Sequence, residues 1–204
     1  MQHLSIDSFS ALLFDLDGTL IDTMPLHNQA WIETLQEFNC PMTDEILQEY
    51  AGVPTLKTVS LLNHRFQWNL DPALVTEKKE ERARELAGSQ SVRLIEPTLA
   101  IVKKYHGKKP MALVTGGARI LVQPNLQKFD LEKYFPFTVC MDDTTRGKPH
   151  PDPFLLAAKK VNTAPENCLV FEDGAAGIAG AQACGMSVVQ VLKDFKLAPL
   201  YTIK

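Results

Sequence analysis

Acidic residues at two distant places in the chain give the clearest chemical signal in this sequence. Asp15 and Asp17 follow an apolar run and lead into a glycine turn, and Glu172 and Asp173 follow a second apolar run. Between them, Lys148 lies in a Gly-Lys-Pro turn. A carboxylate can accept a phosphoryl group as a nucleophile, and a magnesium ion beside it can offset the charge of the phosphate. These residue types therefore predict phosphoryl transfer to a carboxylate.

The charge of a phosphate ester suggests a role for each of these residues. Asp15 is the predicted nucleophile, and Asp17 is predicted to protonate the leaving alcohol and then to activate water. A dianion that approaches Asp15 is repelled, so the site needs positive charge. We expect Lys148 and Mg2+ to supply it, with the metal on Asp15, Asp173, a backbone carbonyl and water.

Short apolar runs without strict alternation predict strands that are covered on both faces of a parallel sheet. Helical patterns lie between most of them, which predicts an α/β fold with a doubly wound, Rossmann-like sheet. The predicted strands are 11–14, 111–114, 137–141, 168–171 and 187–191. The predicted helices between them are 98–105, 118–129 (kinked or broken by Pro124), 153–161 and 177–184.

The candidate residues fall at the carboxyl ends of these strands, where an open parallel sheet binds its ligands. The second strand ends at Thr115, Gly116 and Gly117. We expect the Thr115 hydroxyl and nearby backbone N–H groups to bind phosphoryl oxygens, because glycine lets the backbone approach closely. Thr115 is equally well placed to cap the helix that follows, and the residues alone leave both roles open.

The interval between the first and second predicted strands is much longer than a crossover needs. It spans about a hundred residues and reads as almost wholly helical, with a helix from Pro25 and others over 43–50, 56–66 and 72–87. We therefore predict two domains. A core domain comprises residues 1–22 and 92–204, and a helical cap domain, residues 23–91, is inserted into it.

Four segments of this chain resemble the four motifs of the haloacid dehalogenase superfamily, in the expected order and over nearly the whole chain. They are 15–20, Val114-Thr115, 147–154 and 170–173. The helical insert resembles the type-1 cap of the β-phosphoglucomutase-like subfamily. Two further segments, 105–112 and 71–74, are similar to the YqaB-type sugar phosphatases, which act on fructose-1-phosphate and related compounds.

The resemblance implies the same roles as the chemistry does. It implies Asp15 as nucleophile and Asp17 as acid and base, with the metal on Asp15, the Asp17 carbonyl and Asp173, and with Glu172 beside or behind it. It also implies phosphate binding by Thr115 and Lys148. One departure is Gly174, where many relatives have a serine after the aspartate.

Substrate-binding candidates in the helical insert are less specific. His27 and Trp31 are four residues apart and share a helix face. Gly52 lies in a Gly-Val-Pro turn that resembles the substrate-facing loop of such caps, and Lys57 and Lys78 are candidates to reach a sugar phosphate. Ordinary roles stay open for these side chains: a core tryptophan, a surface histidine and exposed lysines.

The predicted function is a magnesium-dependent phosphatase for small sugar phosphates. A phosphomutase is the alternative, because it forms the same aspartyl-phosphate. The β-phosphoglucomutase cap loop carries an arginine just after its Gly-Val pair, whereas Val53 is followed here by Pro54 and Thr55, which favours hydrolysis. A non-catalytic binding protein on this fold would be expected to have lost Asp15 or Asp17.

Composition limits the partners. The net charge is −3 with no basic run, which argues against nucleic acid, and no stretch approaches the roughly 20 apolar residues of a membrane span. The first ten residues lack a signal-peptide pattern. The four cysteines have no CxxC spacing and are predicted to be free thiols. We expect a cytoplasmic enzyme for a small phosphorylated sugar, a monomer or weak dimer with no nucleic-acid or membrane partner.

Overall fold

The computed structural model describes residues 5–50, 53–89 and 92–198. Gly52, one of the predicted substrate-binding residues, lies outside these ranges. The described chain divides into two compact units. The first, called the sheet unit, contains the residues up to Asp22 and from Leu94 onward, and the second, called the helical unit, is Thr23–Arg93.

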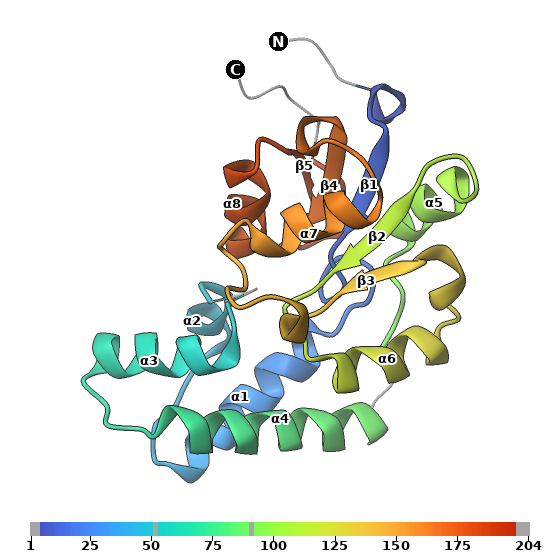
Figure 1. The fold of residues 1–204 in the computed structure, drawn as a ribbon. Helices are drawn as coiled ribbons and strands as arrows, with labels where there is room; N and C mark the ends of the chain where they lie inside the picture. Colours follow the sequence, from blue (N-terminus) through green and yellow to red (C-terminus); the bar gives the residue numbers. More distant parts are fainter. Residues whose placement is uncertain (1–4, 51–52, 90–91, 199–204) are drawn as a thin grey trace. The chain divides into compact units, whose positions relative to one another are not determined.

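Five parallel strands form the sheet of the first unit, in the order β3-β2-β1-β4-β5 (Figure 1). The strands are β1 (Ala11–Phe14), β2 (Met111–Val114), β3 (Phe137–Val139), β4 (Cys168–Glu172) and β5 (Ser187–Gln190). Leu13 of the central strand pairs with Ala112 of β2 and with Val170 of β4. The strand order reverses at β1, and sheets of this kind bind ligands where it reverses.

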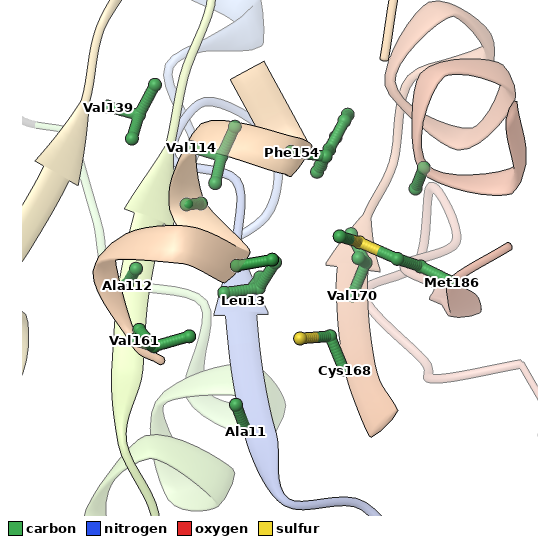
Figure 2. Close-up of a cluster of buried hydrophobic side chains, with 13 residues drawn as sticks. Ala11, Leu13, Ala112, Val114, Val139, Phe154, Val161, Cys168, Val170 and Met186 are labelled. Atoms are coloured by element: carbon green, nitrogen blue, oxygen red, sulfur yellow. The ribbon is translucent and has the colours of Figure 1, made fainter. Parts of the chain in front are cut away.

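Side chains cover the sheet on both faces. Every residue of β1, β2 and β4 is buried, as their continuous apolar sequences require. On one face, Leu13 and Val170 belong to a cluster with Phe154 of α7 (Asp152–Lys160), and α8 (Ala175–Ala183) packs beside α7 (Figure 2). On the other face, Phe14 stacks on Phe171 with ring centroids 4.7 Å apart.

The remaining helices of the sheet unit are α5 (Glu96–Tyr105) and α6 (Arg119–Lys128), with short 3-10 turns η1 (Ile6–Ser8), η2 (Glu132–Tyr134), η3 (Met141–Asp143) and η4 (Pro165–Asn167). In Figure 1, α5 lies behind the sheet and α7 in front of it. The predicted α/β class with a doubly wound parallel sheet is confirmed. The predicted break at Pro124 is wrong, because α6 runs through it while Val122 and Leu126 stay buried. Proline there removes only the bond to the carbonyl of the exposed Ile120.

In the part of the helical unit that the structure describes, the helices are α1 (Met24–Glu37), α2 (Asp44–Gln48), α3 (Thr55–Phe66) and α4 (Pro72–Ser89). Pro25 occupies the first turn of α1, where its missing N–H costs nothing. The Asp71 carboxylate accepts hydrogen bonds from the first N–H groups of α4 and so fixes where that helix begins. The unit has its own apolar core, in which Leu35, Val59, Leu62 and Val75 are fully buried.

Within the described ranges, none of the helices combines the length and the apolar character that a membrane span needs.

Candidate active site

The turn after β1 is packed directly against an acidic side chain from the end of β4. The backbone N–H of Asp15 donates to the carbonyl of Phe171 at 3.0 Å, so the pairing of β1 with β4 continues to the edge of the sheet. Thr19 Oγ1 donates to Asp173 Oδ1 at 3.1 Å. Gly18 has a φ of +81°, and a Cβ atom there would lie 2.3 Å from Asp173 Oδ2. The glycine is therefore required both by the turn and by the approach of Asp173.

A buried lysine joins the ends of β1 and β4. Lys148 is only 3% exposed, and its Nζ donates to Asp15 Oδ1 and to Glu172 Oε2, each at 2.7 Å. These charge-assisted bonds bring together residues that are 133 and 24 positions apart in the sequence. The Gly-Lys-Pro loop thus delivers a single positive charge between two buried carboxylates.

Two glycines at the start of α8, the N-cap Gly174 and Gly177, hold the carboxylate of Glu172. The N–H of Gly174 donates to Glu172 Oε1 at 3.1 Å. A Cβ atom at Gly177 would lie 2.2 Å from the carboxyl carbon of Glu172, so the carboxylate occupies the space that a larger residue would fill. The sequence analysis did not single out Gly177. Nothing in its local pattern marks it, because the clash arises only once α8 is folded back against the end of β4.

Three carboxylates crowd around this one ammonium group. One carboxylate oxygen each from Asp15, Glu172 and Asp173 lies within 4.8 Å of the other two. Burial, and next the charge of Asp15, raise the pKa of Glu172 to about 8 and that of Asp173 to about 7. Burial also raises the pKa of Asp15. For Lys148, burial works in the opposite direction, but the charges of Asp15 and Glu172 outweigh it and raise its pKa.

This charge balance fits a divalent cation. Oxygen donors from carboxylates are the ligands that Mg2+ and Ca2+ take, and one ammonium group cannot neutralise three carboxylates. Burial is the main cause of the raised pKa values of Glu172 and Asp173, and the negative charge of Asp15 adds to it. A cation among these oxygens would offset that negative charge.

Asp17 and Thr115 lie at the same edge of the sheet. Asp17 is partly buried, and its charge contributes to the raised pKa of Asp15. Its carboxylate is not one of the three clustered ones. Thr115 is buried, and its Oγ1 accepts a hydrogen bond from the N–H of Gly117 at 3.0 Å. Gly116 is exposed beside it.

The structure decides one of the two roles left open for Thr115. Helix α6 begins at Arg119 with Ala118 as its N-cap and no side-chain cap from Thr115. Instead, the carboxylate of Asp142, from the loop after β3, accepts the hydrogen bond of the Arg119 N–H at 2.6 Å. Thr115 therefore does not cap the helix, and its hydroxyl proton is not used in the bond with Gly117.

In the helical unit, a lysine that the sequence analysis did not select contacts His27 and Trp31. Lys79 is only 4% exposed, and its Nζ lies 3.3 Å from His27 Nδ1, 3.1 Å from Glu80 Oε1 and 5.7 Å from the centre of the Trp31 ring. Helical spacing alone does not single it out, because Lys78 and Lys79 lie three and four residues from the buried Val75, and both spacings share a helix face.

The two lysines that were selected have different surroundings. Lys78 forms an ion pair with Glu37 at 2.7 Å, and both side chains are about half exposed. Lys57 is exposed on α3. Neither contacts the Lys79 cluster among the described residues, so their proposed contact with substrate stays a prediction.

Comparison with known proteins places the chain in a family. The model of the haloacid dehalogenase-like hydrolase family matches residues 12–191. A hydrolase from Pseudomonas syringae has the same fold, with a TM-score of 0.80 at 24% sequence identity over 89% of this chain and 84% of that one. The chain belongs to the haloacid dehalogenase-like hydrolases.

Named relatives indicate the kind of hydrolase. The chain is 35% identical to the fructose-1-phosphate phosphatase YqaB of Escherichia coli (strain K12), over 91% of this chain and 97% of the relative. It is 31% identical to a phosphorylated carbohydrates phosphatase of Thermotoga maritima, over 91% of this chain and 88% of the relative. The predicted enzyme class, a phosphoric monoester hydrolase, is confirmed by these relatives.

Proposed function

We propose that this enzyme is a Mg2+-dependent phosphatase that hydrolyses small sugar phosphates resembling fructose-1-phosphate, through an aspartyl-phosphate on Asp15. The observation that carries the proposal is the ammonium group of Lys148, held 2.7 Å from both Asp15 and Glu172 beside Asp173. The identity of 35% to a fructose-1-phosphate phosphatase supports the substrate class.

In the proposed reaction, a carboxylate oxygen of Asp15 forms a bond to phosphorus as the bond from phosphorus to the sugar oxygen breaks. Asp17 gives its proton to that leaving oxygen, and later takes a proton from the water that hydrolyses the aspartyl-phosphate. Lys148 offsets the charge of the phosphoryl oxygens. Thr115 and the exposed backbone at Gly116 donate hydrogen bonds to them.

The metal is proposed to be held by Asp15, Asp173 and the Asp17 carbonyl, with Glu172 behind them. When bound, Mg2+ offsets the negative charge of these carboxylates and of the incoming phosphate. Glu172 is already engaged by Lys148 and by the N–H of Gly174. We therefore assign to Glu172 the positioning of Lys148 as well.

Sugar selection is proposed to belong to the helical unit. A sugar offers hydroxyl groups, and the buried Lys79 and the partly buried His27 form a polar pair in this unit that can hydrogen-bond to them. Trp31, Gly52, Lys57 and Lys78 stay candidates from the sequence.

We further propose that the enzyme works in the cytoplasm as a monomer or weak dimer, on a small molecule rather than on nucleic acid. The four free cysteines suit a reducing compartment, and the net charge of −3 does not suit a phosphate backbone.

The test is release of inorganic phosphate from a panel of sugar phosphates, with Mg2+ and with EDTA, by wild type and by Asp15→Asn. Asp194→Asn, which makes the same change at an exposed surface position, is the matched control. We expect Mg2+-dependent release that Asp15→Asn abolishes and Asp194→Asn keeps. Conversion of β-glucose-1-phosphate into glucose-6-phosphate without release would assign the protein to the mutases instead. Release that survives Asp15→Asn would refute the proposed nucleophile.

A further inference from the structure

Two loops at the carboxyl edge of the sheet lie side by side. One is the loop that follows β2, with Thr115, Gly116 and Gly117, and the other follows β3 and leads on to Lys148. The N–H of Thr115 donates to the carbonyl of Val139 at 2.9 Å, and the N–H of Met141 donates to the carbonyl of Gly117 at 3.0 Å. The proposed phosphate-binding loop is thus attached to the loop that delivers the lysine.

Hydrogen bonds made by Arg119 strengthen this attachment. The N–H of Arg119 donates to Asp142 Oδ2 at 2.6 Å. The guanidinium group of the same residue donates to Asp143 and to the carbonyl of Thr138, the latter at 3.3 Å. Asp143 in turn accepts a hydrogen bond from the N–H of Cys140 at 2.7 Å. Arg119, Asp142 and Asp143 are called the Arg119 clamp below.

We infer that Arg119 is a positioning residue for phosphate binding: through the clamp it fixes the loop 115–117 against the loop after β3. Two consecutive glycines have more conformational freedom to lose than other residues, so a loop that contains them is costly to order. The clamp fixes the chain two residues beyond Gly117, whose own N–H donates to Thr115 Oγ1. It thereby limits the conformations from which the Gly116 N–H can reach a phosphoryl oxygen. The inference rests on the proposed function, because it assumes that this loop binds the phosphoryl group.

Geometry favours positioning over direct binding of phosphate by Arg119. Its guanidinium group is occupied by Asp143 and by a backbone carbonyl, and the Arg119 side chain is 45% exposed whereas that of Lys148 is 2% exposed. Both bonds come from Nη2 of the planar guanidinium group, and lysine, which carries a compact ammonium group on a flexible stem, is expected to reproduce them only in part.

The experiment compares Arg119→Ala, Arg119→Lys and the control Arg65→Ala. The control removes an arginine of similar exposure that pairs with Glu49 in the helical unit. We measure kcat and KM for the best sugar phosphate, the inhibition constant of inorganic phosphate, the melting temperature, and hydrogen exchange of the peptide that covers 115–119. We expect Arg119→Ala to raise KM and the phosphate inhibition constant about tenfold and to speed exchange in that peptide. Arg119→Lys recovers part of each effect, and Arg65→Ala matches wild type.

Two outcomes would overturn the inference. One is a lower melting temperature in Arg119→Ala with KM and the phosphate inhibition constant unchanged, which is the result of a merely structural ion pair. The other is unchanged exchange in the peptide 115–119. Hydrogen exchange is measured without substrate, so it tests the effect of the clamp on the loop even if the wild-type enzyme releases no phosphate. Absence of phosphate release would refute only the proposed function.

Discussion

Glu172 shows how a single glycine can decide the geometry of a charged site. Its carboxylate is buried, bonded to Lys148, and lies where a Cβ atom of residue 177 would be. Alanine is the better helix former, yet at this position it would meet the carboxyl carbon at 2.2 Å. The steric conflict outweighs helix propensity, because neither the helix nor the ion pair can move without breaking other contacts.

We expect Gly177→Ala to lower the free energy of unfolding by about 1–3 kcal/mol and to lower kcat at least roughly tenfold, because Glu172 is forced away from Lys148. Thermal unfolding and phosphate release measure the two effects. The control is to make Gly177→Ala in the Glu172→Asp variant, whose side chain is shorter. In that variant the loss of stability caused by Gly177→Ala is expected to be smaller. A Gly177→Ala enzyme as stable and active as wild type would contradict this reading of Glu172.

At the residue scale, the sequence was enough to predict that Asp15, Lys148, Glu172 and Asp173 meet, because each follows a recognisable apolar strand. It could not predict Lys79 as a buried cation, since an adjacent lysine with the same charge was equally plausible. Which of the two faces inward depends on how α4 rotates against α1 and α3.

Among the elements, α4 carries both of these lysines and provides a direct comparison. Lys79 is buried and pairs with Glu80, which also accepts a hydrogen bond from Thr55 at 2.7 Å and thereby connects α4 to α3. Lys78 pairs with Glu37 where both side chains are about half in water. Adjacent positions on one helix therefore differ mainly in burial.

Lys79→Ala is expected to lower the free energy of unfolding by about 2 kcal/mol, because it leaves the partly buried Glu80 without its cation. Lys78→Ala, the matched control, is expected to cost less than about 1 kcal/mol. Urea unfolding measures both. We also expect Lys79→Ala to raise KM for the sugar phosphate, because it removes the hydrogen-bond donor beside His27. Equal costs for the two variants would contradict the difference in burial.

The sequence predicted the individual strands, but it did not predict where each strand ends and the next loop begins. The runs 11–14 and 111–114 match β1 and β2, because strands buried on both faces must be apolar throughout. The third run was predicted to extend to residue 141, but β3 ends at Val139 and Met141 begins η3. That end is set by the contacts of Asp142 and Asp143 with Arg119, which are about twenty residues away in sequence and invisible to local patterns.

At the scale of the whole molecule, the metal is expected to decide how stability varies with pH. In the absence of a cation, Glu172 has a pKa of about 8 and Asp173 of about 7, above their ordinary values of 4.5 and 3.8. A carboxyl group with a raised pKa binds more protons in the folded chain than in the unfolded one. The free energy of unfolding therefore falls as pH rises from about 4 to about 8.

We expect the melting temperature in EDTA to fall between pH 5 and pH 8, and Mg2+ to raise it more at pH 8 than at pH 5. At a Mg2+ concentration far above the dissociation constant, the shift at pH 8 should be about 5 °C. Differential scanning calorimetry measures it without any substrate. Asp173→Asn should reduce both the pH dependence and the Mg2+ shift. A Mg2+ shift of the same size at both pH values would show that the cation does not bind these carboxylates.

The most direct measurement of the central claim is the covalent intermediate itself. Wild type, Asp15→Asn and Asp17→Asn are mixed with a sugar phosphate labelled in its phosphoryl group and quenched in acid, and the labelled peptide is identified. The account predicts label on the peptide that contains Asp15, released by hydroxylamine as an acyl phosphate should be. Asp15→Asn should carry no label, and label that forms in Asp17→Asn should persist, since removal of phosphate needs the base. Two results would contradict the account. One is phosphate release by wild type with no label on that peptide at any quench time, and the other is label that remains in Asp15→Asn.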